Sequence, residues 1–444
     1  MKQALPSIRF DENRCRGRMA CLHICPTQAI RVRDRKARLL RDLCMDCGEC
    51  VRVCPSGAIR PQTGSFADLS RFRHTIAIPS PVIYSQFGKG VPPSAILVAL
   101  RGIGFNDAWD VACASESVSI AIEEYLKTVP APRPLISPFC PAIVRLIQIR
   151  YPNLLEHLIP IESPMEIAAR EAKRRAMKEH GLKESEIGAV YITPCPSKSL
   201  AITNPLRKRH SFLNGTIAIS DIYTSLLRAL PSQAQNGEAE EIRGLGLGWP
   251  IVGGQVACLK AEECLAIGGL EGAMRIFEEI ENGKLRDIEY IEVHSCPTGC
   301  VGGSLTVENP YIARGHTLRT VRTFGGKPCQ DPEKIKDLYR RNFFSLPGTI
   351  APVPLRPLDE DVSRALQKLH RKKEVLEGLP QIDCGACGSP TCAVFAEDVV
   401  RGEAREDECP FVAMLEFEHL STGLLEKIRP HSRRLSFPRT EEHP

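Results

Sequence analysis

The stretch EVHSCPTGCVGG, residues 292–303, contains two closely spaced cysteines and is the most informative part of this chain. Two shorter stretches resemble it in kind: SPFCP at 137–141 and TPCPSK at 193–198. A ferredoxin binds its cluster with cysteines from one compact run. Cysteines scattered over three distant stretches require a folded domain to bring them together, so they predict a redox protein with a metal centre for reaction or sensing. The four cysteines are Cys140, Cys195, Cys296 and Cys300.

The composition is that of a globular protein with several domains. The chain has 444 residues, of which 43% are hydrophobic and 25% charged. Its 19 cysteines occur mostly in tight groups that suit thiolate–metal binding in a reducing cytoplasm. Residues 1–10 lack an apolar segment typical of a signal peptide, and no apolar run is long enough to span a membrane. Basic residues are spread out despite a net charge of +5, so we expect no nucleic-acid partner.

Residues 1–62 contain an internal repeat typical of a bacterial dicluster ferredoxin, a small α+β domain. The second copy has the spacing C-x2-C-x2-C-x3-C-P, in which the fourth cysteine reaches across to the other cluster. The first copy has arginine at the second cysteine position. The residues between the copies alternate as in a β-hairpin. The repeat cysteines are Cys15, Cys21 and Cys25 in the first copy, and Cys44, Cys47, Cys50 and Cys54 in the second.

The crossed pattern gives one complete ligand set and one incomplete set. The incomplete set has Arg18 at its fourth position, and guanidinium has no lone pair to offer a metal. That site could be a 3Fe-4S cluster, a 4Fe-4S cluster with an outside ligand, or no cluster. A zinc ribbon is the alternative for the whole segment. The complete set is Cys25, Cys44, Cys47 and Cys50; the incomplete set is Cys15, Cys21 and Cys54.

Residues 73–345 alternate short apolar runs with helical stretches, which predicts an α/β domain with a mainly parallel sheet. At least two of the three cysteine stretches directly follow a predicted strand, where an open α/β sheet places its site. We expect strands at 75–78, 188–192 and 290–293, and helices at 94–100, 117–126 and 271–279.

The C-terminal part predicts a small helical iron–sulfur module at 361–428. A proline-rich linker at 346–360 precedes it, and a polar tail at 429–444 follows it. A helix is expected at 361–377, another at 391–402 and an amphipathic one from 411 to 428. The spacing C-x2-C-x4-C-x16-C-P resembles the 4Fe-4S domain of electron-transfer complexes and corrinoid proteins, with zinc as the alternative. Its cysteines are Cys384, Cys387, Cys392 and Cys409.

With these motifs in their order, the central region resembles the catalytic domain of [FeFe]-hydrogenases. That family carries T-S-C-C-P, M-P-C-x2-K and E-x-M-A-C-x3-C-x-G-G at similar separations. The resemblance implies an H-cluster, which is a 4Fe-4S cubane bridged by Cys300 to a diiron unit with CO, cyanide and azadithiolate. It further implies that Lys198 hydrogen-bonds a cyanide, and that Gly302 and Gly303 permit close approach of the backbone.

The chain departs from this family at its proton relay. Active members have a relay cysteine where this chain has Phe139, and a phenyl ring cannot transfer a proton. The next relay member falls at Glu123 or Glu124, and we take Glu124 as the candidate. His294 replaces the methionine of the third motif; it either provides a bypass for protons or fills the pocket. Fast hydrogen turnover is therefore not expected.

These features suggest a cytoplasmic iron–sulfur protein that senses hydrogen or converts it slowly. Family members with a broken relay resemble sensory hydrogenases, so the expected partner is a redox protein or a separate signalling protein. One alternative is an electron-transfer subunit with only a cubane in its central domain. Another is an iron–sulfur assembly factor, although the C-terminal module disfavours it.

Four cysteines belong to no ligand set, and we interpret them as buried free thiols. They are Cys113, Cys258, Cys264 and Cys329. Cys258 and Cys264 are expected in a helical stretch before the third motif.

Overall fold

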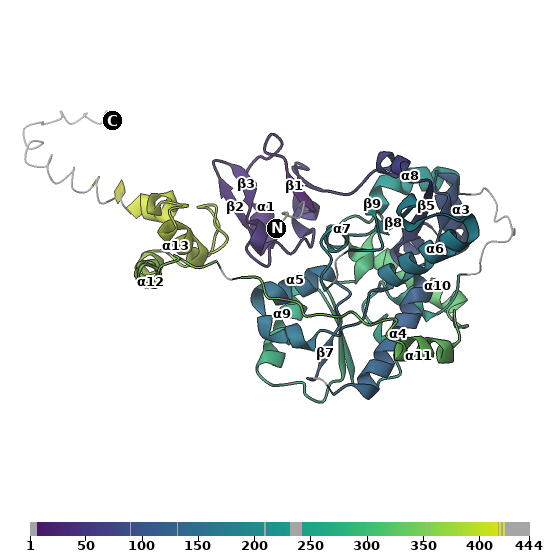
Figure 1. The fold of residues 1–444 in the computed structure, drawn as a ribbon. Helices are drawn as coiled ribbons and strands as arrows, with labels where there is room; N and C mark the ends of the chain where they lie inside the picture. Colours follow the sequence, from purple (N-terminus) through teal and green to yellow (C-terminus); the bar gives the residue numbers. More distant parts are fainter. Residues whose placement is uncertain are drawn as a thin grey trace, which may run out of the picture. The chain divides into compact units, whose positions relative to one another are not determined.

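The computed structural model describes residues 7–88, 90–130, 132–207, 210–230, 242–354, 356–415, 417, 418 and 421 (Figure 1). These residues form two compact units. The first unit contains the residues before 15 and residues 41–354, and the second contains residues 15–40 and the residues after 354. The two copies of the ferredoxin-like repeat therefore fall in different units, and each unit is described by itself below.

A four-stranded parallel sheet in the first unit has the strand order β6-β5-β8-β9. Every residue of β8 is buried, as expected for a parallel strand covered on both faces. This sheet confirms the strands predicted at 75–78 and 188–192. Its strands are β5 His74–Pro79, β6 Asp107–Ala108, β8 Ile187–Thr193 and β9 Gly215–Ala218.

A second parallel sheet in the same unit has the order β10-β11-β7. Its strands are β7 Leu135–Ile136, β10 Cys264–Gly268 and β11 Tyr290–His294. The strand predicted at 290–293 is confirmed, but the helical assignment of Cys264 is wrong because Cys264 begins β10 and pairs with Tyr290. The apolar run CLAIG pairs along β11, and this non-local pairing outweighs local preference. Cys258 ends the short 3-10 helix η7, Val256–Cys258.

Nine α-helices of the described part of the first unit surround the sheets (Figure 1). The helices predicted at 94–100, 117–126 and 271–279 are confirmed as parts of α3, α4 and α9. α4 packs against α6, α11 and the 3-10 helix η6. The helices are α3 Pro93–Gly102, α4 Ala112–Thr128, α5 Pro141–Arg150, α6 Pro164–His180, α7 Pro196–Thr203, α8 Ile219–Ala229, α9 Leu270–Glu281, α10 Pro310–Phe324 and α11 Pro332–Arg340.

Proline begins six of these helices, which is the position where its missing N–H costs least. In α5 and α7 the residue before the proline is a cysteine, Cys140 or Cys195, in an extended conformation at the N-cap. The Cys-Pro pairs in the sequence therefore place two cysteines at the junction between a strand end and a helix start.

Short elements complete the first unit. β1 Ile8–Phe10 pairs antiparallel with β4 Ile59–Pro61, and α2 spans Glu49–Val53. The other 3-10 helices are η1 Arg41–Leu43, η2 Phe66–Arg71, η3 Pro81–Ser85, η4 Pro152–His157, η5 Glu184–Glu186, η6 Leu245–Gly248 and η8 Cys300–Gly302.

The second unit combines α1, Ala20–Ile24, and a β-hairpin with the C-terminal helices. The hairpin pairs β2 Ile30–Arg33 with β3 Lys36–Leu39, as predicted. Helix α12 covers Val362–Glu377 and α13 covers Cys392–Val400, which confirms both predicted helices; η9 spans Glu406–Glu408. Residues 410–415 are helical, whereas most of the predicted helix after 415 and all of the predicted tail lie outside the described residues.

A buried carboxylate connects the hairpin to α13 within this unit. Asp398, 2% exposed, accepts hydrogen bonds from Arg31 Nε at 2.6 Å and from Arg33 Nη2 at 2.9 Å. Ser389 Oγ donates to the same oxygen at 2.6 Å. Val32 also donates its N–H to the carbonyl oxygen of Gly388, next to Cys387. The hairpin therefore lies directly on the loop that carries the C-terminal cysteines.

Candidate functional site

The structure brings the four scattered cysteines of the first unit together. Cys140 follows β7, Cys195 follows β8, and Cys296 follows β11, so the cysteines come from the ends of strands in both sheets. Burial raises the pKa of the Cys296 thiol, and the charges of the three other cysteines raise it further. Such mutual effects require short distances between the four sulfur atoms.

Hydroxyl groups lie beside three of these sulfur atoms. Cys140 Sγ and Ser295 Oγ are 3.5 Å apart, and the same hydroxyl lies 3.9 Å from Cys296 Sγ. Cys195 Sγ lies 3.3 Å from Ser197 Oγ. Hydrogen bonds to sulfur stabilise thiolate charge, and iron–sulfur proteins tune their clusters in this way.

Lys198 supplies positive charge to the same site from the first turn of α7. Burial opposes its protonation, but the charges of Tyr191, Cys300 and the other nearby cysteines outweigh burial, so the pKa of Lys198 is raised. Its ammonium also donates to the main-chain oxygen of Phe139 at 3.4 Å. Lys198 is therefore a fixed cation that faces the cysteine group.

His294 connects Cys300 to a buried glutamate that sequence reasoning missed. Its Nε2 lies 2.7 Å from Glu292 Oε1, and its Nδ1 lies 3.8 Å from Cys300 Sγ. Burial opposes the charged imidazolium, but the hydrogen bonds with Cys300 and Glu292 outweigh burial and raise the pKa of His294 to about 10. The protonated ring donates from both nitrogens, so His294 directs a hydrogen bond at the Cys300 sulfur.

Glu292 is fully buried and saturated with donors. Besides His294, it accepts the N–H groups of Gly253, Gln255 and Val256, each at 3.0 Å. A glutamate inside an otherwise apolar strand was the available sequence signal, because a carboxylate is buried there only when it has partners. Its donors come from a loop some forty residues earlier, which local patterns do not reveal.

A narrow cavity of about 50 Å³ adjoins Cys300. Phe139 and Trp249 form one wall, with ring centroids 5.1 Å apart, and Trp249 is held by its indole N–H to Ser119 Oγ at 2.9 Å. Lys198, His294 and Gln255 contribute the longer polar side chains of the lining. The remaining lining residues are Ser80, Pro81, Val111, Ser115, Ser163, Pro164, Met165, Tyr191 and Pro250.

The candidate relay carboxylate lies elsewhere. Glu124 pairs with exposed Lys127 at 3.3 Å. Neither Glu124 nor Glu123 lines the cavity. Glu123 Oε1 instead accepts the main-chain N–H of Lys260 at 2.9 Å. The structure therefore brings Phe139, Lys198 and His294 together with the cysteines, but not Glu124.

Gly302 and Gly303 allow the third cysteine stretch to approach its neighbours. A Cβ on Gly303 would overlap the carbonyl oxygen of Pro194, and one on Gly302 would lie 2.5 Å from Thr298 Oγ1. Both separations are shorter than van der Waals contact. A side chain on Gly303 would push the second and third stretches apart, whereas one on Gly302 would disturb the third stretch itself. The close approach predicted for these glycines is made here to protein atoms.

The second repeat copy lies against the same stretches within the first unit. Arg52 donates to the carbonyl oxygen of Gly302, and Arg145 of α5 donates to the carbonyl oxygens of Asp42 and Cys44. A Cβ on Gly48 would overlap the hydroxyl oxygen of Ser304. The loop with Cys44, Cys47 and Cys50 is thus adjacent to the central cysteine group.

Backbone and side-chain donors also surround the other predicted ligands. Cys44 Sγ accepts the N–H of Asp46 at 3.4 Å in the first unit. Burial opposes ionisation of the Cys54 thiol, but hydrogen bonds from Ser56 and nearby N–H groups outweigh burial and lower its pKa. In the second unit, Cys15 Sγ accepts the N–H of Ala37, and Cys25 Sγ that of Ala29.

The C-terminal cysteines gather at the start of α13. Cys387, Cys392 and Cys409 pack in one apolar cluster with Phe395. Burial raises the pKa of Cys387, and the charges of Cys409 and Cys384 also raise it. Each of the two predicted ferredoxin ligand sets combines cysteines of both units, so these sets stay predictions. The role of Cys21 as a ligand also stays a prediction.

Within the described residues, no three His, Cys, Asp or Glu side chains come close enough to hold one metal ion. Ligands around a cluster stand further apart, because several atoms separate them. None of the helices in the described ranges is long and apolar enough to cross a lipid bilayer.

Comparisons with protein families match three segments. Residues 73–224 match "Iron only hydrogenase large subunit, C-terminal domain", residues 8–62 match "4Fe-4S dicluster domain", and residues 379–411 match "Putative Fe-S cluster". The matched segments correspond to the central, N-terminal and C-terminal cysteine groups, although the first match ends before Cys296.

Individual relatives are distant. Iron hydrogenase 1 of Clostridium pasteurianum is 25% identical over 346 residues, which are 62% of this chain and 59% of the relative. The chain thus spans less than two thirds of that protein. The periplasmic [Fe] hydrogenase large subunit of Nitratidesulfovibrio vulgaris is 22% identical over 56% of this chain and 73% of the relative. A variant of the [FeFe]-hydrogenase HydA1 from Chlamydomonas reinhardtii, a solved structure, aligns with a TM-score of 0.49 and 15% identity, covering 65% of this chain and 98% of that one.

Proposed function

We propose that this distant relative of the iron-only hydrogenases is a multi-cluster redox protein with an H-cluster-type centre that senses hydrogen or converts it slowly. One observation carries the proposal: four cysteines from three strand ends converge beside a cavity lined by Lys198 and Phe139. A redox or signalling protein is the partner that such a centre needs. We also assign the chain to a reducing, cytoplasmic setting, because most of its 19 cysteines stand in groups that suit thiolate–metal binding.

The central cysteines fit a 4Fe-4S cubane. Cys140 and Cys195 are N-caps of α5 and α7, so the positive ends of two helix dipoles point toward thiolate charge. The hydroxyls of Ser295 and Ser197 and the ring of His294 lie within hydrogen-bond distance of the sulfur atoms and can donate to thiolates. Such donors stabilise the anionic cluster and set its potential. Gly303 keeps the loops close enough for all four cysteines to bind one cluster.

The chemistry of the residues that line the cavity beside Cys300 suits a second metal group with anionic ligands. Lys198 is charged and would donate to a cyanide-type ligand, while Phe139 and Trp249 exclude water from the apolar side. A diiron unit bound there supplies the interconversion of hydrogen with protons and electrons. The side chain of Phe139 holds no exchangeable proton, and Glu124 lies outside the lining. Proton exchange is then slow, which suits a sensor better than a rapid catalyst.

A second function has its own supporting observation. The free volume beside Cys300 is only about 50 Å³, well below the roughly 300–1,000 Å³ of typical ligand sites. A chain with only a cubane in this domain would act as an electron-transfer protein. The two functions differ in the presence of the diiron unit.

Infrared spectroscopy of the full chain tests the proposal after anaerobic cluster reconstitution and maturation with the diiron cofactor. We expect bands of CO and cyanide, together with iron in excess of that required for the cubanes. A protein with full cubane content and no such bands would instead support the electron-transfer function. Cys300→Ser is the matched control, because it removes the bridging thiolate and should abolish the bands.

A further inference from the structure

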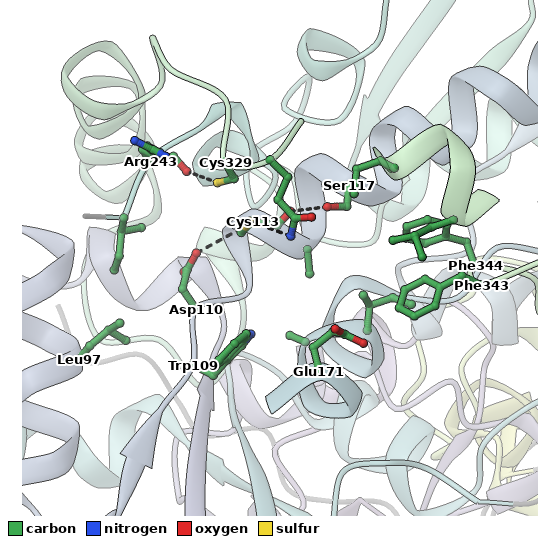
Figure 2. Close-up of a pocket in the computed structure, with 17 residues that line it drawn as sticks. Leu97, Trp109, Asp110, Cys113, Ser117, Glu171, Arg243, Cys329, Phe343 and Phe344 are labelled. Carbon is green, nitrogen blue, oxygen red and sulfur yellow. Dashed lines mark hydrogen bonds between the residues drawn. The ribbon is translucent and has the colours of Figure 1, made fainter. Parts of the chain in front are cut away.

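The first unit contains a second, larger cavity that the proposed function does not use. Its volume is about 510 Å³, within the range of small-molecule sites. Residues of α4, α6 and α11 line it, among them Ser117, Glu171 and Ile335. Figure 2 shows that Cys113 and Cys329 lie next to each other in its wall, and neither belongs to a predicted ligand set.

Both thiols are held by defined contacts. Cys113 is the second residue of α4, and its Sγ accepts from Gln330 Nε2 at 3.5 Å. Cys329 Sγ lies 2.6 Å from the main-chain oxygen of Arg243, and the Cys329 N–H donates to Glu116 Oε1 at 3.1 Å. The two thiols lie side by side, since Cys113 Sγ contacts the residue after Cys329 and the Cys329 N–H contacts the helix that carries Cys113. The pair is thus preorganised by partners on three different segments.

We propose that Cys113 and Cys329 are a redox-active dithiol that low-molecular-weight disulfides, of the oxidised glutathione class, convert reversibly into a disulfide. The Cys113 thiolate attacks one sulfur of the small disulfide, which forms a mixed disulfide and releases one small thiolate. Cys329 then loses its proton to solvent and attacks the Cys113 sulfur, which releases the second small thiolate. Two electrons pass from the pair to the reagent, and the leaving thiolates take up two protons.

The surroundings distinguish the attacking thiol from the resolving one. Cys113 lies in the first turn of a 17-residue helix, where the helix dipole favours a thiolate. The hydrogen bond with Cys329 lowers the pKa of Cys113, against burial, and Gln330 lowers it further. The same hydrogen bond raises the pKa of Cys329. Cys113 is therefore the nucleophile of the first step.

Formation of the bond requires only a local movement. A disulfide needs its sulfur atoms about 2.05 Å apart, so the two neighbouring thiols must move toward each other to form the bond. The cavity beside the pair gives a small reagent access to Cys113. A Cβ on Gly244 would lie 2.8 Å from Cys329 Sγ, so glycine at 244 leaves space for the Cys329 sulfur.

The test uses the full chain with its clusters, equilibrated without oxygen in buffers of increasing ratio of oxidised to reduced glutathione. Free thiols are then alkylated, and peptides are analysed by mass spectrometry. We expect one cross-linked peptide pair, lighter by two hydrogen masses, with Cys113 and Cys329 disappearing from the alkylated pool together. Reduction should reverse this change. Iron content measured in parallel must stay constant, which keeps the result independent of the metal centres.

Variants sharpen the result. Cys258→Ser, which removes another non-ligand thiol, should leave the cross-link unchanged, whereas Cys113→Ser should leave Cys329 reduced. If Cys113→Ser does not fold, the wild-type series decides alone. Alkylation of both residues at the most oxidising ratio, or separate glutathione adducts without a cross-link, would overturn the proposal.

Discussion

At position 139 a phenyl ring faces Trp249, while the main-chain oxygen of the same residue accepts a hydrogen bond from Lys198. The ring closes the apolar side of the cavity beside Cys300. A thiol at this position would place an exchangeable proton where the proposed centre needs one. Under the proposed function, the side chain at 139 would therefore decide between a sensor and a rapid catalyst.

Phe139→Cys should raise hydrogen evolution of the matured protein by about an order of magnitude or more, since a positioned proton donor contributes roughly 10²–10⁴-fold to catalysis. Activity is measured with a reduced viologen dye and divided by the diiron content from infrared bands. Phe139→Leu is the control, because it opens the cavity without adding a proton. An equal gain in both variants would assign the effect to space rather than to proton transfer.

Glu292→Gln should lower the thermal unfolding midpoint, because it weakens four hydrogen bonds to a fully buried carboxylate. Disrupting a buried charged partnership costs about 3–5 kcal/mol. Differential scanning calorimetry of the anaerobic protein provides the measurement. Glu271→Gln is the control, since its exposed pair with Arg275 contributes little. A midpoint equal to that of the control would contradict the assigned role.

Cys329→Ala, which removes the donor at this position, should slow alkylation of Cys113 at constant pH. The hydrogen bond with Cys329 is the largest cause of the lowered pKa of Cys113, and only the thiolate reacts. In the wild type, the rate should rise with pH at lower values than for Cys258, whose pKa burial raises to about 12. A time course of iodoacetamide labelling between about pH 7 and 9, followed by mass spectrometry, tests both points. Faster labelling of Cys113 in the variant would show that access, not ionisation, controls the rate.

At the level of elements, strand-to-helix junctions organise the site, and glycine controls their spacing. Gly303→Ala should cause loss of about one cubane of iron per chain, because the added methyl group meets the carbonyl oxygen of Pro194. The backbone of Gly303 has φ −62°, so alanine itself is not strained there. Gly315→Ala in α10, which meets no atom within 4 Å, should retain all iron and gain up to ~1 kcal/mol of helix stability. Equal iron content in both variants would contradict the spacing argument.

Asp398→Asn should release the β2–β3 hairpin from α13 in the second unit. The carboxylate receives hydrogen bonds from two arginines and a serine, each worth roughly 1.5–3 kcal/mol when charged. Hydrogen exchange followed by mass spectrometry should therefore show faster exchange over residues 30–39. Asp407→Asn, which affects an exposed pair with Arg405, should leave that rate unchanged.

The sequence predicts the larger elements because their signals are local. Strands β5, β8 and β11 are mostly apolar runs, and α12 and α13 begin with an N-cap side chain that accepts a backbone N–H. The two-residue strands β6 and β7 give no periodic signal, and β10 forms only by pairing with β11. The arrangement in two parallel sheets instead of one depends on such non-local pairing.

The candidate site shows the same division between local and distant information. Cysteine–proline pairs mark the converging residues, and the fixed offset from Cys195 marks Lys198. The pairing of Glu292 with His294 and the packing of Trp249 on Phe139 involve residues 249–256, whose position cannot be predicted from the sequence. The prediction of Glu124 rests only on aligning this helix with the relay motif of the family. In the structure, its carboxylate pairs with Lys127.

At the scale of the whole chain, the two repeat copies have different neighbours. The loop of Cys44, Cys47 and Cys50 contacts the central cysteine stretches through Arg52 and Arg145. The hairpin next to Cys15 and Cys25 contacts the C-terminal module through Asp398. Each half of the ferredoxin-like segment is thus attached to a different metal-binding region.

The hairpin contact has a consequence for the path of an electron. Val32 and Gly388 are joined by a hydrogen bond although more than three hundred residues separate them in the chain. If the first repeat copy and the C-terminal module both carry clusters, an electron on the C-terminal cluster is close to the first repeat copy. The C-terminal cysteines then lie next to the first repeat copy in space although they come last in the sequence, and removing the C-terminal module would deprive the first copy of this neighbour.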